Sequence, residues 1–219
     1  MRTSLKLAAA TLAVLAGGLL GPSVFADDSE GEKKPIAKTG EKAPDFTLKD
    51  LEGKEVSLAK VLEQKKIVVL EWFNPECPVV KGHYEKNTMT ELQKKYKDKV
   101  VWLAINSGAK GKQGHGIEKN KAAAEKWKIS WPILFDESGA VGRLYAAKTT
   151  PHMFVIDAKG VLAYQGAIDS AGGKRGKRGG NKEVVNYVDR ALTALLAGEK
   201  VEVTDTKPYG CSVKYGVQE

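Results

Sequence analysis

The chain has 219 residues, a formal net charge of +8 and only two cysteines. This length suffices for one substantial core but not for two full domains, so we expect a single domain with tails. The positive charge is partly concentrated in one glycine-rich segment that contains Lys174, Arg175, Lys177 and Arg178. We expect a solvated loop there, with an anionic or membrane-surface contact as the alternative. Because no aromatic residues are interleaved for base stacking, the charge does not predict nucleic-acid binding.

The first 26 residues have the pattern of a secretory signal peptide. Arg2 and Lys6 precede an uncharged apolar run over residues 7–20, and residues 24–26 end in a small residue. The run is shorter than the roughly 20 residues that span a bilayer, which favours cleavage over the alternative of an uncleaved anchor helix. We therefore predict a signal peptide over residues 1–26 and an exported protein, periplasmic or extracellular, without stable membrane insertion after cleavage.

The segment after the signal peptide lacks an apolar pattern. Residues 27–42 are highly charged, which predicts a flexible lead-in. The domain proper is expected over residues 43–198. It opens with two predicted strands, 45–48 and 56–58, which flank a turn at Gly53 and form a hairpin.

The rest of the domain alternates strands with helices. Residues 67–72 are apolar apart from Glu71, which is typical of a central strand buried on both faces. The further predicted strands are 100–105, 133–135, 153–156 and 161–164, and the predicted helices are 78–96, 117–127, 140–145 and 183–197. This order predicts an α/β fold with a mixed central sheet and helices on both faces, followed by a C-terminal tail over residues 199–219.

Cys77 lies where the apolar strand stops at Asn74-Pro75 and Pro78 opens the next helix. A thiol at such a junction faces unpaired backbone N–H groups and the positive end of the helix dipole, and both favour the thiolate. The other cysteine, Cys211, is in the tail, and export would allow the two to form a disulfide. A purely structural bridge, worth on the order of 4 to 5 kcal/mol in the chain-entropy model, stays open beside a redox-active pair.

Four segments resemble parts of the thioredoxin-like superfamily, in particular its peroxiredoxin-like (alkyl hydroperoxide reductase and thiol-specific antioxidant) branch and its exported thiol-disulfide oxidoreductases. Residues 43–58 resemble the opening hairpin, and residues 68–81 resemble the strand, active-site turn and helix that carry the nucleophilic cysteine. Residues 135–160 resemble the later part with its cis-proline, and residues 210–215 resemble a glycine-cysteine-serine ending. The resemblance implies a thioredoxin-like fold over residues 43–198.

The resemblance also implies roles for individual positions. Cys77 matches the nucleophile, and Pro151 matches the cis-proline that faces it. Val80 stands where the second cysteine of a Cys-x-x-Cys pair would be, and Asn74 stands where peroxiredoxins have a threonine. A mechanism with a neighbouring thiol is thereby excluded, so Cys211 or an external thiol must resolve the oxidised form of Cys77.

The implied chemistry begins when the Cys77 thiolate attacks a disulfide sulfur or a peroxide oxygen, giving a mixed disulfide or a sulfenic acid. Thr150 and Pro151 would shape a groove for an extended peptide. Trp72 would wall the site, with an ordinary core aromatic as the alternative. Glu76 is expected to oppose the thiolate by like charge. The implied partners are a peroxide or a substrate protein and an external thiol reductant, with no cofactor and no metal.

Two alternatives of other classes stay open. Cys77 with His83, together with His115 or His152, is a candidate copper site on a thioredoxin fold, although such proteins usually bring two closely spaced cysteines. In a non-catalytic binding module, Cys77 and Cys211 would form a permanent bridge or be spectators, and Cys77 would stay unreactive after mild reduction. The sequence contains no Ser-His-Asp, paired-carboxylate or phosphate-loop motif.

Overall fold

The computed structural model describes residues 36–172 and 183–217. The predicted signal peptide and the basic cluster from Lys174 to Arg178 lie outside the described residues. Within the described part, no helix combines the length and the apolar character needed to cross a membrane.

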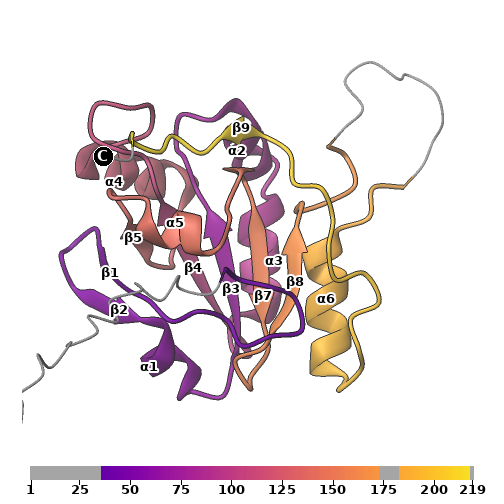
Figure 1. Cartoon of the computed structure of the whole chain (residues 1–219). Coiled ribbons are helices and arrows are strands. Elements are labelled where there is room, and N and C mark those ends of the chain that lie inside the picture. The colour runs from indigo at the N-terminus through magenta and orange to yellow at the C-terminus, as the bar shows by residue number, and fades with distance from the viewer. Residues whose placement is uncertain (1–35, 173–182, 218–219) are drawn as a thin grey trace, which may run out of the picture. The chain divides into compact units, whose positions relative to one another are not determined.

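Seven strands form one mixed sheet with helices on both of its faces (Figure 1), in the order β2-β1-β5-β4-β3-β7-β8. The pairs β3/β4 and β4/β5 are parallel, and the other neighbouring pairs are antiparallel. The strands of this sheet are β1 (Thr47–Asp50), β2 (Glu55–Ser57), β3 (Ile67–Trp72), β4 (Val100–Asn106), β5 (Ile133–Phe135), β7 (Met153–Ile156) and β8 (Leu162–Gly166). The helices are α1 (Leu58–Leu62), α2 (Pro78–Glu85), α3 (Thr88–Tyr96), α4 (Ile117–Trp127), α5 (Ala140–Leu144) and α6 (Tyr187–Leu196).

Strand β3 is the central strand that its apolar sequence predicts. All six of its residues are buried, and it lies between β4 on one side and β7 on the other. Because side chains alternate along a strand, Val69 faces one core whereas Val68 and Leu70 face the other. The prediction of an α/β fold with a mixed sheet is confirmed.

The two faces of the sheet carry different sets of helices. The first core is formed with side chains from α2, α3, α4 and α6, and it includes Cys77. The second core is formed with side chains from α1 and α5. In Figure 1, α3 lies behind β7 and α5 lies in front of the sheet. Residues on opposite faces of β3 therefore belong to different layers of the molecule.

The N-terminal part of the described chain packs earlier than the sequence predicts. The hairpin of β1 and β2 forms as expected, with Gly53 at a φ of +82° in its turn. The lead-in, however, was expected to be flexible up to residue 42. The Ala37 N–H donates to the Leu144 carbonyl at 2.9 Å and the Gly40 N–H to the Leu162 carbonyl at 2.8 Å. Composition alone gave no signal for these contacts, because they are made by the backbone.

The single helix predicted over residues 78–96 is wrong, because the chain forms α2 and α3 with a break between them. The break lies at Asn87, which adopts the left-handed conformation with a φ of 59°. Asparagine is one of the few residues other than glycine that visit this region readily. The apolar pattern continues across the break, which is why periodicity did not reveal it.

The C-terminal tail returns over the domain and adds a second, two-stranded sheet. Strand β9 (Cys211–Ser212) pairs antiparallel with β6 (Thr149–Thr150), in a register that sets Cys211 opposite Thr150. In Figure 1 the yellow tail passes from α6 to the end of the molecule where α2 begins. The tail therefore brings its cysteine to the end of the sheet where the strand-to-helix junction lies.

Candidate active site

Cys77 lies at the junction between β3 and α2. It is the N-cap residue of α2, and Pro78 occupies the first turn, where its missing N–H leaves no hydrogen bond unmade. The connection is a tight turn in which the Cys77 N–H donates to the Asn74 carbonyl at 3.1 Å. The Asn74 side chain accepts a hydrogen bond from the Glu76 N–H at 2.9 Å. The Cys77 side chain is 0% exposed, so its sulfur points into the protein at the start of the helix.

The structure brings four of the predicted site residues together. The Cys77 Sγ donates to the Thr150 carbonyl oxygen at 3.0 Å, and the peptide bond between Thr150 and Pro151 is cis. Cys211 lies opposite Thr150 in the β6–β9 pair, which places it beside Cys77, whose sulfur contacts the Thr150 carbonyl oxygen. Both thiols are free. The site is thus a reduced pair of thiols, one at a helix N-terminus and the other on the tail.

The surroundings make the two thiols unequal. Burial alone raises the pKa of Cys77, but the polar groups around its sulfur, among them the Cys211 thiol and the Val80 N–H, outweigh burial and hold the pKa below that of an ordinary cysteine. The bond to the Thr150 carbonyl opposes them, because it keeps the proton on the sulfur. Burial and the adjacent Cys77 sulfur raise the pKa of Cys211 to about 11. Cys77 is therefore the thiol of the pair that ionises first.

The carboxylate of Glu76, the residue before Cys77, is held by groups from the glycine-rich loop and α4. Its carboxylate accepts hydrogen bonds from the Gly114 N–H at 2.5 Å and the Lys119 ammonium at 3.1 Å. These contacts lower the pKa of Glu76, and the contact with Gly114 has the largest effect. The neighbouring negative charge is compensated by the glycine-rich loop and α4, which sequence adjacency alone did not indicate.

Trp72 lies on the other side of the sheet from Cys77. It is fully buried in the second core, 5.5 Å from the ring of Tyr145 and 5.0 Å from that of Phe154. Its indole N–H donates to the Ser107 hydroxyl at 3.0 Å. The prediction that Trp72 walls the site therefore gives way to its alternative, an ordinary core aromatic. The reason is strand alternation, which directs residue 72 away from the face that Cys77 joins.

Glu71, a residue to which the sequence analysis gave no role, is a buried carboxyl on the Cys77 side of the sheet. It accepts hydrogen bonds from the Tyr84 hydroxyl at 3.0 Å and the Trp102 indole N–H at 3.0 Å. Burial raises its pKa to about 7, against the effect of those hydrogen bonds. The signal was present in the sequence, since Glu71 is the only charged residue in a central strand that is otherwise apolar.

A second unpredicted group fixes the tail beside Cys77. The Tyr209 hydroxyl donates to the Asp169 carboxylate at 2.5 Å and lies 3.0 Å from the His83 Nε2. Burial, and then Asp169, raise the pKa of Tyr209 far above its ordinary value. Burial lowers the pKa of His83, although Asp169 acts in the opposite direction. These residues are widely separated in the chain and share no motif, so no sequence signal links them.

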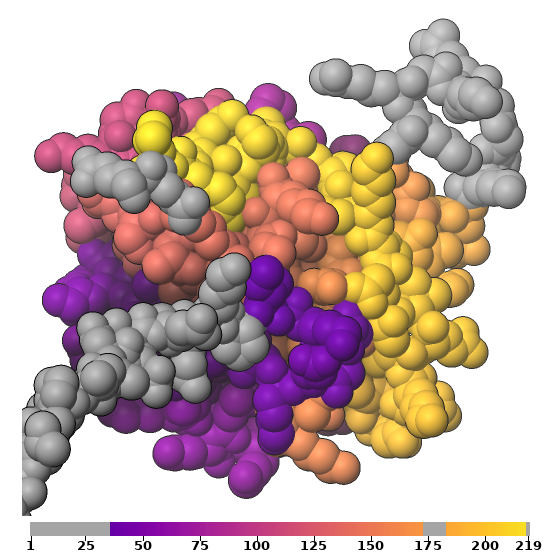
Figure 2. Space-filling model, viewed as in Figure 1, coloured from indigo at the N-terminus to yellow at the C-terminus, as the bar shows by residue number. Residues whose placement is uncertain are grey.

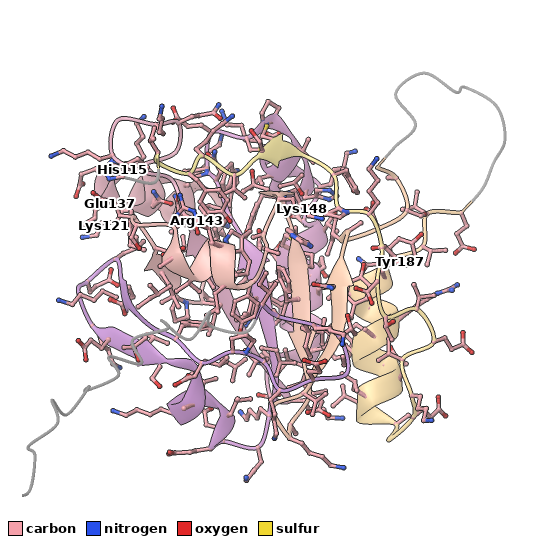
Figure 3. The ribbon with its side chains drawn as sticks, in the orientation of Figure 1. His115, Lys121, Glu137, Arg143, Lys148 and Tyr187 are labelled. Atoms are coloured by element: carbon pink, nitrogen blue, oxygen red, sulfur yellow. The ribbon has the colours of Figure 1, made fainter. Side chains whose placement is uncertain are left out.

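The histidines of the candidate copper site are engaged in different places. His83 belongs to the tail contact just described. The His115 Nε2 lies 3.0 Å from a Glu137 carboxylate oxygen, and Figure 3 shows these two side chains beside each other and well apart from Lys148. His152 accepts a hydrogen bond from the Lys148 N–H, and burial lowers its pKa to about 3. Over residues 36–172 and 183–217, no three His, Cys, Asp or Glu side chains gather as a metal site.

The sheet order, the cysteine at the start of α2 and the cis-proline that faces it define a thioredoxin-fold protein with a thiol site. The AhpC/TSA family pattern matches residues 39–165. The chain belongs to the AhpC/TSA family, as its resemblance implied.

Individual relatives agree with this assignment. The chain is 29% identical over 157 residues to a thioredoxin-like protein of Bacillus subtilis, a match that covers 72% of this chain and 86% of the relative. It is 33% identical over 142 residues to a thiol-disulfide oxidoreductase of Geobacillus thermodenitrificans, covering 64% and 75%. A solved structure of a hypothetical protein from Sinorhizobium meliloti superposes with a TM-score of 0.72 at 26% identity, covering 83% of this chain and 96% of that one.

Proposed function

We propose that the chain is an exported thiol-based oxidoreductase in which Cys77 is the nucleophile and Cys211 resolves its oxidised form. The observation that carries the proposal is the meeting of the two cysteines at Thr150, whose carbonyl oxygen contacts the Cys77 sulfur and whose strand pairs with Cys211 from the distant tail. The family and the relatives support the class of chemistry. Export rests on the signal-peptide pattern of residues 1–26.

The reaction has three steps. The Cys77 thiolate attacks a peroxide oxygen, which gives a sulfenic acid and releases an alcohol or water, or it attacks a disulfide sulfur, which gives a mixed disulfide and releases a thiol. Cys211 then attacks the Cys77 sulfur, so that a Cys77–Cys211 disulfide forms and water or the second substrate thiol leaves. Two equivalents of an external thiol return both cysteines to the reduced form and leave as a disulfide.

The unequal pKa values support this order of events. In the reduced site, Cys77 ionises first and Cys211 is held as a thiol, in part by the adjacent sulfur of Cys77. A neutral sulfenic acid at Cys77 removes that negative charge. Cys211 then loses its proton more readily and attacks, because a thiolate and not a thiol is the nucleophile. The resolving thiol is thus restrained until its target exists.

The site has no second cysteine on α2, and Val80 lies at the position that this cysteine would occupy. Val80 is fully buried in the first core. Its backbone N–H, in the first turn of α2, still favours the thiolate and lowers the pKa of Cys77. We propose that α2 stabilises the thiolate while the tail supplies the resolving thiol, with Thr150 and Pro151 shaping the site between them.

The proposal is tested by mass-spectrometric disulfide mapping of the mature protein, before and after mild reduction and one equivalent of peroxide. We expect a Cys77–Cys211 bond that reduces readily and forms again with peroxide. Cys211→Ser should accumulate a sulfenic acid at Cys77 that a dimedone probe traps, whereas Cys77→Ser should form none. If Cys77 stays a free thiol towards both peroxide and disulfide reagents, or if the bond resists reduction, a non-catalytic binding module with a structural disulfide replaces the enzyme.

A further inference from the structure

The edge of β6 is the surface at which an extended polypeptide would be held beside Cys77. Thr150, whose carbonyl accepts the Cys77 thiol proton, is one of the two residues of this strand. Polypeptides that are recognised through their main chain commonly add a strand to such an edge. Whether the edge is free or occupied therefore decides which substrates can reach the sulfur.

The tail of the protein itself occupies this edge. Cys211 is the register partner of Thr150, and the Val213 N–H extends the contact by donating to the Lys148 carbonyl at 3.1 Å. Gly210 has a φ of +142°, and a Cβ placed there would lie 2.0 Å from the Thr150 carbonyl oxygen. Only glycine permits so close an approach. The tail therefore packs against the same Thr150 carbonyl that contacts the Cys77 sulfur.

Two tyrosines hold this part of the tail, one on each side of Cys211. The Tyr209 hydroxyl donates to the Asp169 carboxylate at 2.5 Å. The Tyr215 hydroxyl donates to the Ala147 carbonyl at 2.8 Å, and the Arg143 guanidinium lies 4.9 Å from the centre of the Tyr215 ring. We call residues 209–215 the strap. Both of its ends are anchored to the body of the domain by hydrogen bonds.

Glycines in the domain leave room for both anchor rings. A Cβ at Gly172 would lie 1.7 Å from the Tyr209 ring, and one at Gly142 would lie 2.4 Å from the Tyr215 hydroxyl. In Figure 2 the yellow tail covers the end of the orange and magenta segments as a continuous band. The Cys77 side chain, whose sulfur contacts Thr150 opposite Cys211 of the tail, is 0% exposed. The strap is packed against the domain and covers the site on the β6 side.

We infer that the strap is a built-in strand that occupies the polypeptide-binding edge of β6 and so reserves Cys77 for small oxidants, excluding disulfides presented by a polypeptide. This inference rests on the proposed function of Cys77. A polypeptide must displace β9 and release the anchors of Tyr209 and Tyr215 before it can pair with Thr150. A peroxide needs only an opening of its own size.

With a small oxidant, both the oxidation of Cys77 and the formation of the disulfide can be completed while the strap stays paired with β6. The Cys77 sulfur attacks a hydroperoxide, so that an S–O bond forms, the O–O bond breaks and an alcohol leaves after taking up a proton. The Cys211 sulfur then attacks Cys77, an S–S bond forms, the S–O bond breaks and water leaves. The resolving thiol belongs to the strap and lies beside its target, because Cys211 pairs with Thr150, whose carbonyl oxygen contacts the Cys77 sulfur. No second polypeptide is required until an external thiol reduces the disulfide.

The test compares the rates at which Cys77 reacts with hydrogen peroxide and with a short extended peptide that carries a mixed disulfide. Tyr215→Ala and Tyr209→Phe each remove one anchor of the strap. Loss of one hydrogen-bonded anchor should raise the population of the open strap, and with it the peptide rate, by about tenfold or more. The peroxide rate should change by less than about threefold, because it does not depend on strand pairing.

Tyr145→Phe is the matched control. It also removes a tyrosine hydroxyl that donates to a backbone carbonyl, that of Pro44 at 2.6 Å, but one away from the strap. The peptide rate should not rise in this variant. The inference is overturned if wild type reacts with the peptide as fast as with peroxide, or if neither anchor variant changes the ratio of the two rates. A Cys77 that reacts with neither reagent in any variant refutes the proposed function itself.

Discussion

Glu71→Gln tests the electrostatics of the core beneath the site. The Glu71 side chain is fully buried, and its oxygens accept hydrogen bonds from Tyr84 and Trp102. A glutamine has the same shape and keeps a carbonyl for the Trp102 N–H, while the Tyr84 oxygen can accept from its amide. The substitution therefore removes the ionisable proton and leaves the packing in place.

The size and sign of the effect follow from the pKa. In the folded protein burial raises the pKa of Glu71 from 4.5 to about 7. Because the folded pKa lies above the unfolded one, the folded state holds the proton more tightly. This stabilisation is complete below about pH 4.5 and is lost as the pH rises through 7. At about 1.4 kcal/mol for each unit of pKa difference, wild type loses about 3 kcal/mol of unfolding free energy across this window, and Glu71→Gln does not.

The assay is urea unfolding of both proteins from pH 4.5 to 8, with the thiols kept reduced. Subtracting the two curves cancels the titration of all other groups, so the difference should grow by about 3 kcal/mol in favour of glutamine. Glu55→Gln, at an exposed position of β2, is the control for the same chemical change outside the core. A difference for Glu71→Gln that stays constant within about 0.5 kcal/mol would show that this carboxyl does not titrate between these limits.

Three further predictions concern the helix junctions and the site. Cys211→Ala removes the neighbouring thiol that contributes most to lowering the pKa of Cys77, so that pKa should rise in a titration of thiolate absorbance. Asn87→Ala should lower the unfolding free energy by about 1 kcal/mol, and Asn87→Gly should not, because alanine tolerates the left-handed conformation poorly. Trp72→Phe removes the bond to Ser107 and should cost about 1 to 3 kcal/mol of stability without changing the rate of Cys77 oxidation. A selective loss of that rate would return Trp72 to the site.

The sequence predicts the fold best where a residue pattern is local and repeated. The apolar run of β3 and the alanine- and lysine-rich sequence of α4 mark elements whose observed bounds are those predicted, 67–72 and 117–127. The break at Asn87 was missed because it depends on one backbone conformation within an unbroken apolar pattern. Strand β9 was missed because two residues carry no strand signal, and β9 exists only through its pairing with β6.

The residues of the site were likewise predicted where the sequence pattern is local and missed where it is not. Cys77 could be found from the sequence because a strand, a turn and a proline-led helix are contiguous there. Trp72 was misplaced because a residue near the motif in sequence can still face the opposite core. The contact between Tyr209 and His83 joins residues 126 positions apart, and no local sequence pattern indicates it. Proximity in sequence identified the nucleophile but not the groups that enclose it.

The placement of the second thiol links these features. A resolving cysteine at position 80 would lie on α2 beside the nucleophile, and the edge of β6 would not need to be covered for it to react. Here Val80 fills that position with an apolar side chain, and the second thiol arrives on a strand that must pair with β6 to reach Cys77. The contact that brings the resolving thiol to its target is therefore the same contact that closes the edge to other strands. In this arrangement, the proposed resolution by Cys211 and the inferred exclusion of polypeptide substrates depend on one interaction, and a variant that weakens β9 should weaken both together.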